Sequence, residues 1–382
     1  MKLFILQENF SKALNIVSRN ISSKSSIPIL SNVLIEAKGG NVIISGTNLE
    51  TYVRVIVGAE IEQPGIVCVP AKTFADFINL LPSGRLELNI EDASLNVVSS
   101  TSHAKIQVSM AQDFPQVSLD DSVPLCELKA TDLVNGISKV SFSTAKDNLR
   151  PILTGVLLEP GGRNLALVGA DGNRLSKNVV TSETDLKMES TYVIPFASLD
   201  EVVKIVSDRG VADGDLIELF AIKNDNQILF KYKGVDFITR LIEGQFPDYQ
   251  AAVPKEFKFR IKALKDEFSN AVKIANVFAQ RDGATKIILN IDLESKIISF
   301  DASAQEIGSN STSVGFDIIE GTGKFRTAFN IKYLSECLNH ISTGKIEIAG
   351  FGPKADIDST GGVFYEEGNP NFFNMIMPLR IS

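Results

Sequence analysis

The chain has 382 residues, of which 44% are hydrophobic and 22% charged, and it carries a net charge of −8. This composition excludes a disordered chain, and no apolar run approaches the length of a membrane-spanning helix. The negative charge argues against a protein that coats nucleic acid with its whole surface, but it does not exclude one basic face. The length exceeds one ordinary core and indicates two or three domains.

The start of the chain and its cysteines favour a cytoplasmic location. A short apolar run at residues 3–6 is followed at once by polar residues 7–9, so we expect no signal peptide. Cys68, Cys126 and Cys337 are odd in number and widely spaced. They favour a reducing, cytoplasmic setting.

One pattern occurs three times along the chain. IPILSNVLIE at 27–36 aligns with RPILTGVLLE at 150–159, and the match continues without a gap from 41–48 to 164–171. A weaker third copy lies at 296–303. Such a repeat predicts three similar domains. We place them at residues 1–125, 126–254 and 255–382.

Each copy contains two predicted amphipathic helices. The first helices are expected at residues 8–20, 130–142 and 263–275, with Asn9 and Thr131 as candidate N-caps. The second helices are expected at residues 72–81, 197–206 and 332–341, where apolar residues coincide at spacings of four and three. Acidic residues coincide there too, at Asp76, Glu201 and Glu336.

Alternating apolar and polar residues between the helices predict antiparallel strands and hairpins. The clearest runs are at residues 85–90, 94–99, 104–110, 216–222, 227–233 and 237–242. Residues 304–323 are interpreted as a loop. Each copy is therefore expected to be an α+β unit, with two helices on a curved antiparallel sheet.

A polar, partly basic face recurs on the predicted helices and just after them. If the units close into a ring with their helices inside, this face would hold the phosphates of duplex DNA without reading its sequence. The alternative is that these are ordinary solvated side chains. The predicted DNA-facing residues are Lys12, Arg19, Lys24, Lys72, Lys139, Lys146, Arg150, Lys204, Lys273, Arg281 and Lys332.

Several short motifs resemble functional sites but lack a required residue. GTGKF at 321–325 lacks the earlier Gly and the final Ser or Thr of a phosphate loop, and it is interpreted as a turn. His103 and His340 lie far apart without other ligands at metal spacing. Cys337 lies on an apolar helical stripe and is expected to be a buried thiol. We predict no catalytic, cofactor or metal site.

Four segments together resemble the bacterial DNA polymerase III beta subunit family, the sliding clamps. They are RPILTGVLLE (150–159), GADGNRL (169–175), LIEGQFPDYQ (241–250) and MPLR (377–380), and the triple repeat extends the resemblance over the full length. Ala170 and Asn173 stand where family members usually have Thr and His, and Ala251 and Ala252 where they often have Arg and Val.

The resemblance implies a DNA clamp fold and a non-catalytic function. Two chains would form a head-to-tail homodimer, with edge strands of domains one and three continuing the sheet across each interface, as a ring around duplex DNA. The DNA polymerase III catalytic subunit, the clamp loader and repair proteins would each dock a short peptide between domains two and three. The matching positions for this pocket are Leu153, Ala170, Gly172, Asn173, Arg174, Leu175, Pro247, Met375, Met377, Pro378, Leu379 and Arg380.

Two alternatives stay open at this point. The apolar C-terminal segment, NMIMPLRIS, is either a last core strand or part of the pocket, and both hold if its residues alternate between faces. The function is either that of a clamp or that of an enzyme or ligand-binding protein with a site at the 169–175 turn.

Overall fold

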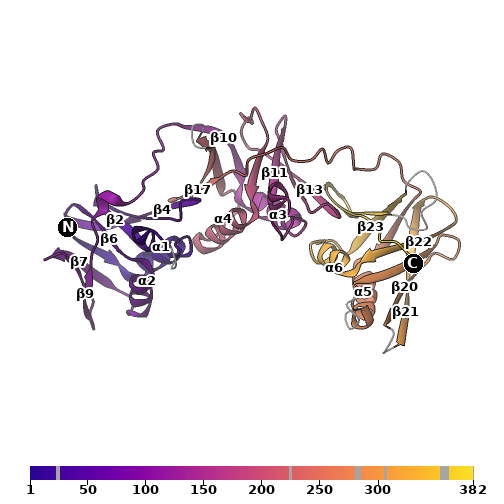
Figure 1. The fold of residues 1–382 in the computed structure, drawn as a ribbon, viewed down its shortest axis with the longest axis horizontal. Helices are drawn as coiled ribbons and strands as arrows, with labels where there is room; N and C mark the ends of the chain where they lie inside the picture. Colours follow the sequence, from indigo (N-terminus) through magenta and orange to yellow (C-terminus); the bar gives the residue numbers. More distant parts are fainter. Residues whose placement is uncertain (23–25, 223–225, 280–284, 305–307, 353–360, 382) are drawn as a thin grey trace. The chain divides into compact units, whose positions relative to one another are not determined.

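The computed structural model describes residues 1–22, 26–222, 226–279, 285–304, 308–352 and 361–381 (Figure 1). The chain forms two compact units. The first contains residues 1–134, 182–189 and 197–241, and the second contains residues 135–181, 190–196 and 242–382.

The described residues contain six α-helices, two in each predicted copy. They are α1 (Gln7–Arg19), α2 (Ala71–Leu80), α3 (Ala130–Ser141), α4 (Phe196–Arg209), α5 (Lys265–Ala279) and α6 (Ile331–Asn339). All six predicted helices are confirmed. The motif Pro-Ile-Leu also takes the same form twice, as 3-10 helices at Pro28–Ser31 and Pro151–Thr154.

The two predicted N-caps are wrong. Asn9 lies inside α1 and Thr131 inside α3, because a strand runs directly into each helix. Strand β1 (Lys2–Leu6) ends where α1 begins, and the cap position Leu6 has extended backbone and no capping side chain. Chain continuity with a sheet therefore sets where these helices start.

The first unit contains two antiparallel sheets. The five-stranded sheet has the order β5 (Glu60–Gln63), β1, β7 (Arg85–Glu91), β8 (Ser94–Val98) and β9 (His103–Gln107). The eight-stranded sheet has the order β10 (Ser122–Lys129), β15 (Leu216–Ile222), β16 (Gln227–Tyr232), β17 (Val235–Arg240), β4 (Thr51–Gly58), β3 (Asn41–Thr47), β2 (Asn32–Lys38) and β6 (Gly65–Pro70). Helices α1 and α2 lie side by side, and α1 packs on β3 and β4 (Figure 1).

The second unit contains a twelve-stranded sheet, and its described strands also pair antiparallel. Its order is β14 (Tyr192–Pro195), β11 (Gly155–Gly161), β12 (Asn164–Ala170), β13 (Arg174–Thr181), β25 (Asn369–Ile376), β24 (Gly361–Glu366), β23 (Lys345–Phe351), β18 (Phe259–Leu264), β21 (Gly308–Glu320), β20 (Ile297–Ala304), β19 (Lys286–Asp292) and β22 (Lys324–Asn330). Helix α5 packs on β20 and β21 and contacts α6.

The loop predicted at residues 304–323 is wrong over most of its length. Residues Gly308–Glu320 form β21, which pairs with β20 and, near its end, with β18. Its Gly, Ser, Asn and Thr residues are typical of turns, but cross-strand pairing decides the conformation. Gly321 and Gly323 follow β21 with positive φ angles, so the predicted turn at GTGKF is confirmed.

Strands from the central copy join the sheets of both neighbouring copies. Strand β17 pairs with β4, with Val235 opposite Val55. Strand β13 pairs with β25, with Leu175 opposite Met375. Residues far apart in the sequence are therefore held in register on shared sheets.

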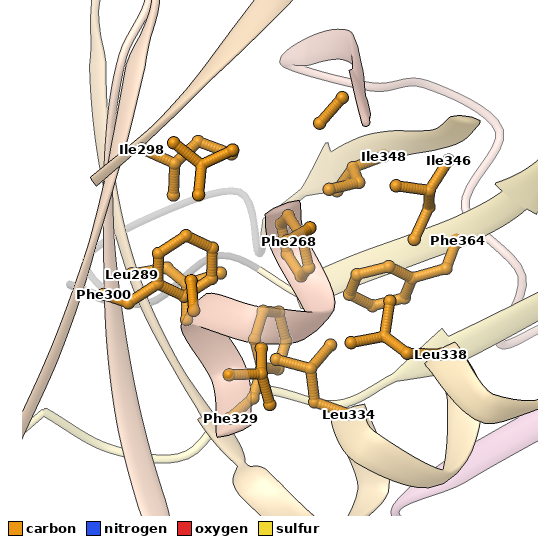
Figure 2. Close-up of a cluster of buried hydrophobic side chains, with 14 of the residues drawn as sticks. Phe268, Leu289, Ile298, Phe300, Phe329, Leu334, Leu338, Ile346, Ile348 and Phe364 are labelled. Atoms are coloured by element: carbon orange, nitrogen blue, oxygen red, sulfur yellow. The ribbon is translucent and has the colours of Figure 1, made fainter. Parts of the chain in front are cut away.

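The core of the second unit lies between α5, α6 and the strands around them (Figure 2). Phe268 of α5 meets Phe300 of β20 edge to face, with ring centroids 4.8 Å apart. Leu334 and Leu338 of α6 point into the same core (Figure 2). Cys337 is fully buried there, and burial raises the pKa of its thiol. The expectation of a buried thiol is confirmed.

Candidate functional site

A tight turn joins β12 to β13. The backbone N–H groups of Asn173 and Arg174 donate to Oδ1 of Asp171 at 2.9 and 3.0 Å. Gly172 has a φ of +91°, which side-chain-bearing residues rarely adopt. The Asp-Gly pair therefore fixes where β13 begins.

Arg174 is buried, and its guanidinium has several hydrogen-bond and ring partners. Its guanidinium donates to Oδ2 of Asp171 at 3.0 Å, to Oε2 of Glu336 on α6 and to the carbonyl oxygen of Phe142. It also lies 4.2 Å from the ring centroid of Tyr333. Because a buried charge is costly unless it is paired, this network ties the turn to α6 and to the segment after α3.

The C-terminal segment runs alongside this turn. The N–H of Met377 donates to the carbonyl oxygen of Asn173 at 2.8 Å, and the N–H of Leu379 to that of Ala328 at 2.7 Å. Met375 is 3% exposed, whereas Met377 is 43% exposed. The segment is thus both a core strand and an exposed apolar surface.

The pocket predicted from the resemblance has a buried apolar base. Leu153, Ala170, Leu175 and Met375 belong to one hydrophobic cluster, which also contains Tyr249. The four predicted residues come from four different segments of the chain. Three of these segments are the neighbouring strands β12, β13 and β25, so the base of the pocket depends on the sheet that these strands share.

The loop carrying Pro247 is fastened to the same region. The hydroxyl of Tyr249 donates to Oε2 of Glu159 on β11, and Nε2 of Gln250 donates to Oε1 at 3.2 Å. Burial, together with the neighbouring carboxylate, raises the pKa of Tyr249. Pro247 itself is exposed.

A hollow of about 490 Å³ opens at the turn. It is lined by Thr144, Ala145, Lys146, Asp147, Leu149, Arg150, Leu153, Asp171, Asn173, Arg174, Asn330, Lys332 and Tyr333. Three of these were predicted for the peptide pocket: Leu153, Asn173 and Arg174. Three others were predicted to face DNA: Lys146, Arg150 and Lys332. No repeated pattern in the sequence marks Leu149 or Tyr333, and both were missed.

The other predicted pocket residues do not line this hollow. Ala170, Leu175 and Met375 lie in the buried cluster. The remaining ones lie on the turn, the 245–249 loop and the C-terminal segment: Gly172, Pro247, Met377, Pro378, Leu379 and Arg380.

A second hollow, of about 730 Å³, lies along α1 and α2 in the first unit. Three predicted DNA-facing residues line it: Lys12, Arg19 and Lys72. Arg19 is paired, since its guanidinium lies 2.9 Å from Oε1 of Glu201 and 2.7 Å from Oδ2 of Asp208. Within the described residues, Lys12 and Lys72 are exposed and have no ion pair.

Lys139 is held inside the second unit. Its side chain is 15% exposed, forms an ion pair with the buried carboxylate of Glu366, and lies 4.9 Å from the ring centroid of Phe372. The same carboxylate accepts from the N–H and hydroxyl of Ser342 and from the amide of Asn369. This placement counts against the prediction that Lys139 faces DNA.

The remaining predicted DNA-facing residues have varied surroundings. Lys204 pairs with Asp200 one helical turn away at 2.7 Å, and Lys273 is exposed on α5. Lys24 and Arg281 lie outside the described residues.

The described part of the chain lacks two further kinds of site. No group of three His, Cys, Asp or Glu residues there is arranged to hold a metal ion. None of the helices described has the length and apolar character that a membrane crossing requires.

Three family models match the chain in order. The N-terminal, central and C-terminal domains of the DNA polymerase III beta subunit match residues 1–118, 127–248 and 250–380. The chain belongs to the DNA polymerase III beta subunit family. It has the three-domain DNA clamp fold of this family and its function as a sliding clamp in DNA replication. The enzyme alternative is not favoured by these matches. Our domain boundaries at 125 and 254 stay predictions.

Relatives of the family cover the chain from end to end. The beta sliding clamp of Staphylococcus aureus (strain Mu50) is 27% identical over 393 residues, which span 100% of this chain and 99% of that protein. The crystal structure of the Bacillus subtilis sliding clamp matches at 23% identity with a TM-score of 0.91, and all of both chains is covered. A C. crescentus beta sliding clamp matches at 24% identity with a TM-score of 0.88, covering 100% of this chain and 99% of that one.

Proposed function

We propose that this clamp works as a closed head-to-tail homodimer that encircles duplex DNA without sequence specificity and tethers partner proteins by short peptides. The observation that carries the proposal is the apolar cluster around Leu153 and Leu175, which lies beside the exposed Met377 and the hollow at the 171–173 turn. Flexible apolar side chains suit a groove that accepts several different partners. The C. crescentus clamp was crystallised with polyethylene glycol at a region named for beta-motif tethering.

The basic residues on the helices would hold the duplex. Lys12, Lys72 and Lys273 are exposed and have no ion pair within the described residues, so their charges are available to phosphates. Contacts to phosphate give affinity without sequence information, which permits sliding.

The partners would be the DNA polymerase III catalytic subunit, the clamp loader and repair proteins with a clamp-binding peptide. The clamp would supply no bond chemistry. A tethered polymerase that leaves the primer end rebinds at high effective concentration, and processivity follows. We place this work in the cytoplasm, where the three buried cysteines would stay reduced.

The two chains would join at sheet edges. Strand β9 is the last strand of the five-stranded sheet, and its alternate residues are exposed. An open edge of this kind pairs readily with another chain, and a closed ring would leave it covered.

The native mass and DNA retention test the ring. A particle of twice 41.5 kDa, kept on circular but not on linear DNA, is expected. Small-molecule binding that survives in a monomer, with no retention on circles, would instead support a ligand-binding protein.

A double substitution tests the peptide pocket. Met377→Ala with Leu379→Ala should weaken peptide binding by at least about ten-fold, the cost of losing a central apolar anchor, and leave the dimer mass unchanged. Met110→Ala, at a methionine that is 76% exposed in the first unit, is the matched control. Loss of the dimer in the double variant would assign the C-terminal segment to the fold alone.

A further inference from the structure

The turn at residues 171–174, here called the second turn, has an equivalent in the first unit. The repeat places Asn48 where Asp171 stands, so the first turn is at residues 48–51. Oδ1 of Asn48 accepts the backbone N–H groups two and three residues later at 2.9 and 2.7 Å. Oδ1 of Asp171 does the same at 2.9 and 3.0 Å. The two turns therefore share one backbone frame.

The chain that runs past each turn is also bound in the same way. At the first turn, the N–H of Arg240, the last residue of β17, donates to the carbonyl oxygen of Glu50 at 3.0 Å. At the second turn, the N–H of Met377 donates to the carbonyl oxygen of Asn173 at 2.8 Å. Glu50 and Asn173 are equivalent positions of the repeat, so Arg240 stands where Met377 does.

An apolar base follows the first turn as it follows the second. In the first unit, Tyr52 pairs with Ile238, and both belong to one hydrophobic cluster with Leu34. In the second unit, Leu175 pairs with Met375, and both belong to the cluster that forms the base of the predicted pocket. The frame and the base of that pocket therefore occur a second time in the chain.

The two turns differ in which side chain is apolar and exposed. At the second turn it is Met377, which is 43% exposed, and the turn itself carries Gly172. At the first turn, Arg240 takes the position of Met377, and Leu49 takes the position of Gly172. Leu49 is 44% exposed. The first turn thus keeps an exposed apolar group, but it is on the turn instead of on the strand beside it.

Leu49 has a backbone conformation that is unfavourable for its side chain. Its φ is +76°, and a bulky residue at positive φ is uncommon and strained. Among the described residues that have positive φ and are not Gly, it alone has a large apolar side chain. Gly would avoid this strain, as Gly172 does at the second turn. The strained leucine therefore points to a use for its exposed side chain.

A second exposed apolar residue belongs to the same surface. In the second unit, Arg150 lines the same hollow as Asp171. Its equivalent in the repeat is Ile27, which is 45% exposed. The 3-10 helices that follow these two residues are held alike, since each has a hydroxyl that donates at 2.7 Å to the carbonyl oxygen three residues earlier. The repeat therefore places Ile27 beside the first turn.

We propose that the first turn is a second docking site, where Leu49 and Ile27 bind an extended apolar peptide segment of a partner protein. The inference rests on the proposed function, because the class of ligand is that of the pocket with the same frame. Glu50 and Arg240 are both exposed and opposite in charge, so apolar contact rather than net charge decides binding. Each chain would then hold two partner segments at once.

A reporter at the first turn tests the proposal in the full-length protein. The three native cysteines are buried, so a cysteine introduced by Glu50→Cys can be labelled selectively with an environment-sensitive fluorophore. The probe is the peptide Gly-Ser-Leu-Ser-Leu-Phe-Gly-Ser. The reporter is also made in two variants. One is Leu49→Gly, and the matched control at the second turn is Met377→Ala with Leu379→Ala.

A saturable change in fluorescence is expected when the peptide is added. Leu49→Gly should raise the apparent Kd at the reporter by at least about ten-fold, the loss of one central apolar anchor. It should not lower the melting temperature, because Gly relieves the strain at positive φ. The Met377/Leu379 control should keep the fluorescence change. Binding should also persist near 1 M salt, where the Debye length is about 3 Å and charge contacts are screened.

Three results would overturn the inference alone. The first is no change at the reporter, although anisotropy of fluorescein-labelled peptide shows binding to the same protein. The second is a change that is lost in the Met377/Leu379 control and kept in Leu49→Gly, since it would then report the second turn. The third is a lower melting temperature of Leu49→Gly, which would assign Leu49 to the fold. If the peptide does not bind the unchanged protein at all, the peptide pocket of the proposed function fails, and the inference fails with it.

Discussion

A set of cations in each unit shows two ways of holding a positive charge. At the hollow of the first unit, Lys12 and Lys72 are exposed along α1 and α2 without an ion pair in the described residues, whereas Arg19 beside them is paired. In the second unit, Arg174 and Lys139 are largely withdrawn from solvent and bound to acids. Burial and pairing, rather than recurrence in the sequence, thus separate cations that support the fold from those available to a ligand.

The largest effect should come from breaking the Arg174 network. Arg174→Met leaves Asp171 and Glu336 without their main partner, so the free energy of unfolding should fall by roughly 3 kcal/mol. Urea titration followed by circular dichroism measures this. The control is Arg150→Met at the same hollow, which should change stability by less than about 0.5 kcal/mol. If both variants lose the same free energy of unfolding, the ion pairs of Arg174 do not stabilise the fold more than the exposed Arg150 does.

The contribution that Glu366, the partner of Lys139, makes to folding stability depends on pH. Burial alone would raise the pKa of Glu366, but hydrogen bonds from Lys139, Ser342 and Asn369 outweigh it and leave the pKa below the ordinary 4.5. Its stabilising contribution is therefore complete above pH 4.5 and is lost as the pH falls through the lowered value.

Glu366→Gln should lower the free energy of unfolding by about 2 kcal/mol at pH 7, because hydrogen bonds to a buried charge are weakened. The difference between the two proteins should narrow below pH 4.5. Urea midpoints at several pH values measure it, with exposed Glu243→Gln as control. If the difference in urea midpoint between the two proteins stays the same at every pH, the charge of Glu366 does not contribute to stability.

The turn allows a test of backbone conformation by itself. Gly172 and Gly58 both have open space where a Cβ would be, but only Gly172 has a positive φ. Gly172→Ala should therefore destabilise the protein by about 1 kcal/mol through strain, and Gly58→Ala should not. Thermal unfolding of both variants measures the difference, and equal melting temperatures would contradict it.

The smallest expected effect is on the salt dependence of duplex DNA binding. Lys12→Gln should reduce the slope of log K against log salt for duplex binding by about 0.9, one phosphate contact. Arg19→Gln should change it much less, because Glu201 and Asp208 already hold that guanidinium. A larger change for Arg19 would reverse the proposed distinction between paired and unpaired cations.

Much of the fold could be predicted because its signals are local and repeated. The stripe of Leu334 and Leu338 predicted a helix with Cys337 inside, and both features are confirmed. Strand β21 was missed because its composition is that of a turn, although its main pairing partner, β20, directly precedes it in the sequence. The N-caps failed for a similar reason, since the preceding strands fix the helix starts.

The candidate site was less accessible to sequence reasoning. The resemblance drew attention to the 169–175 turn and the C-terminal segment, and the bond between Asn173 and Met377 joins them. Glu336, one of the partners of Arg174, is 162 residues away in the sequence, and no spacing rule connects the two. Burial decides whether a lysine or arginine is a structural or an available charge, and burial depends on the packed molecule.

The sharing of strands between copies limits how the protein can be divided. A fragment that contains only residues 126–254 would lack β4, the partner of β17, and β25, the partner of β13. Strands β17 and β13 would then have unpaired backbone N–H and C=O groups that can pair with another chain. Such a fragment should therefore self-associate instead of behaving as an independent module. Each outer copy thus shares a sheet with the central copy, and exchanging an outer copy between relatives would require the matching strands of the central copy to be exchanged with it.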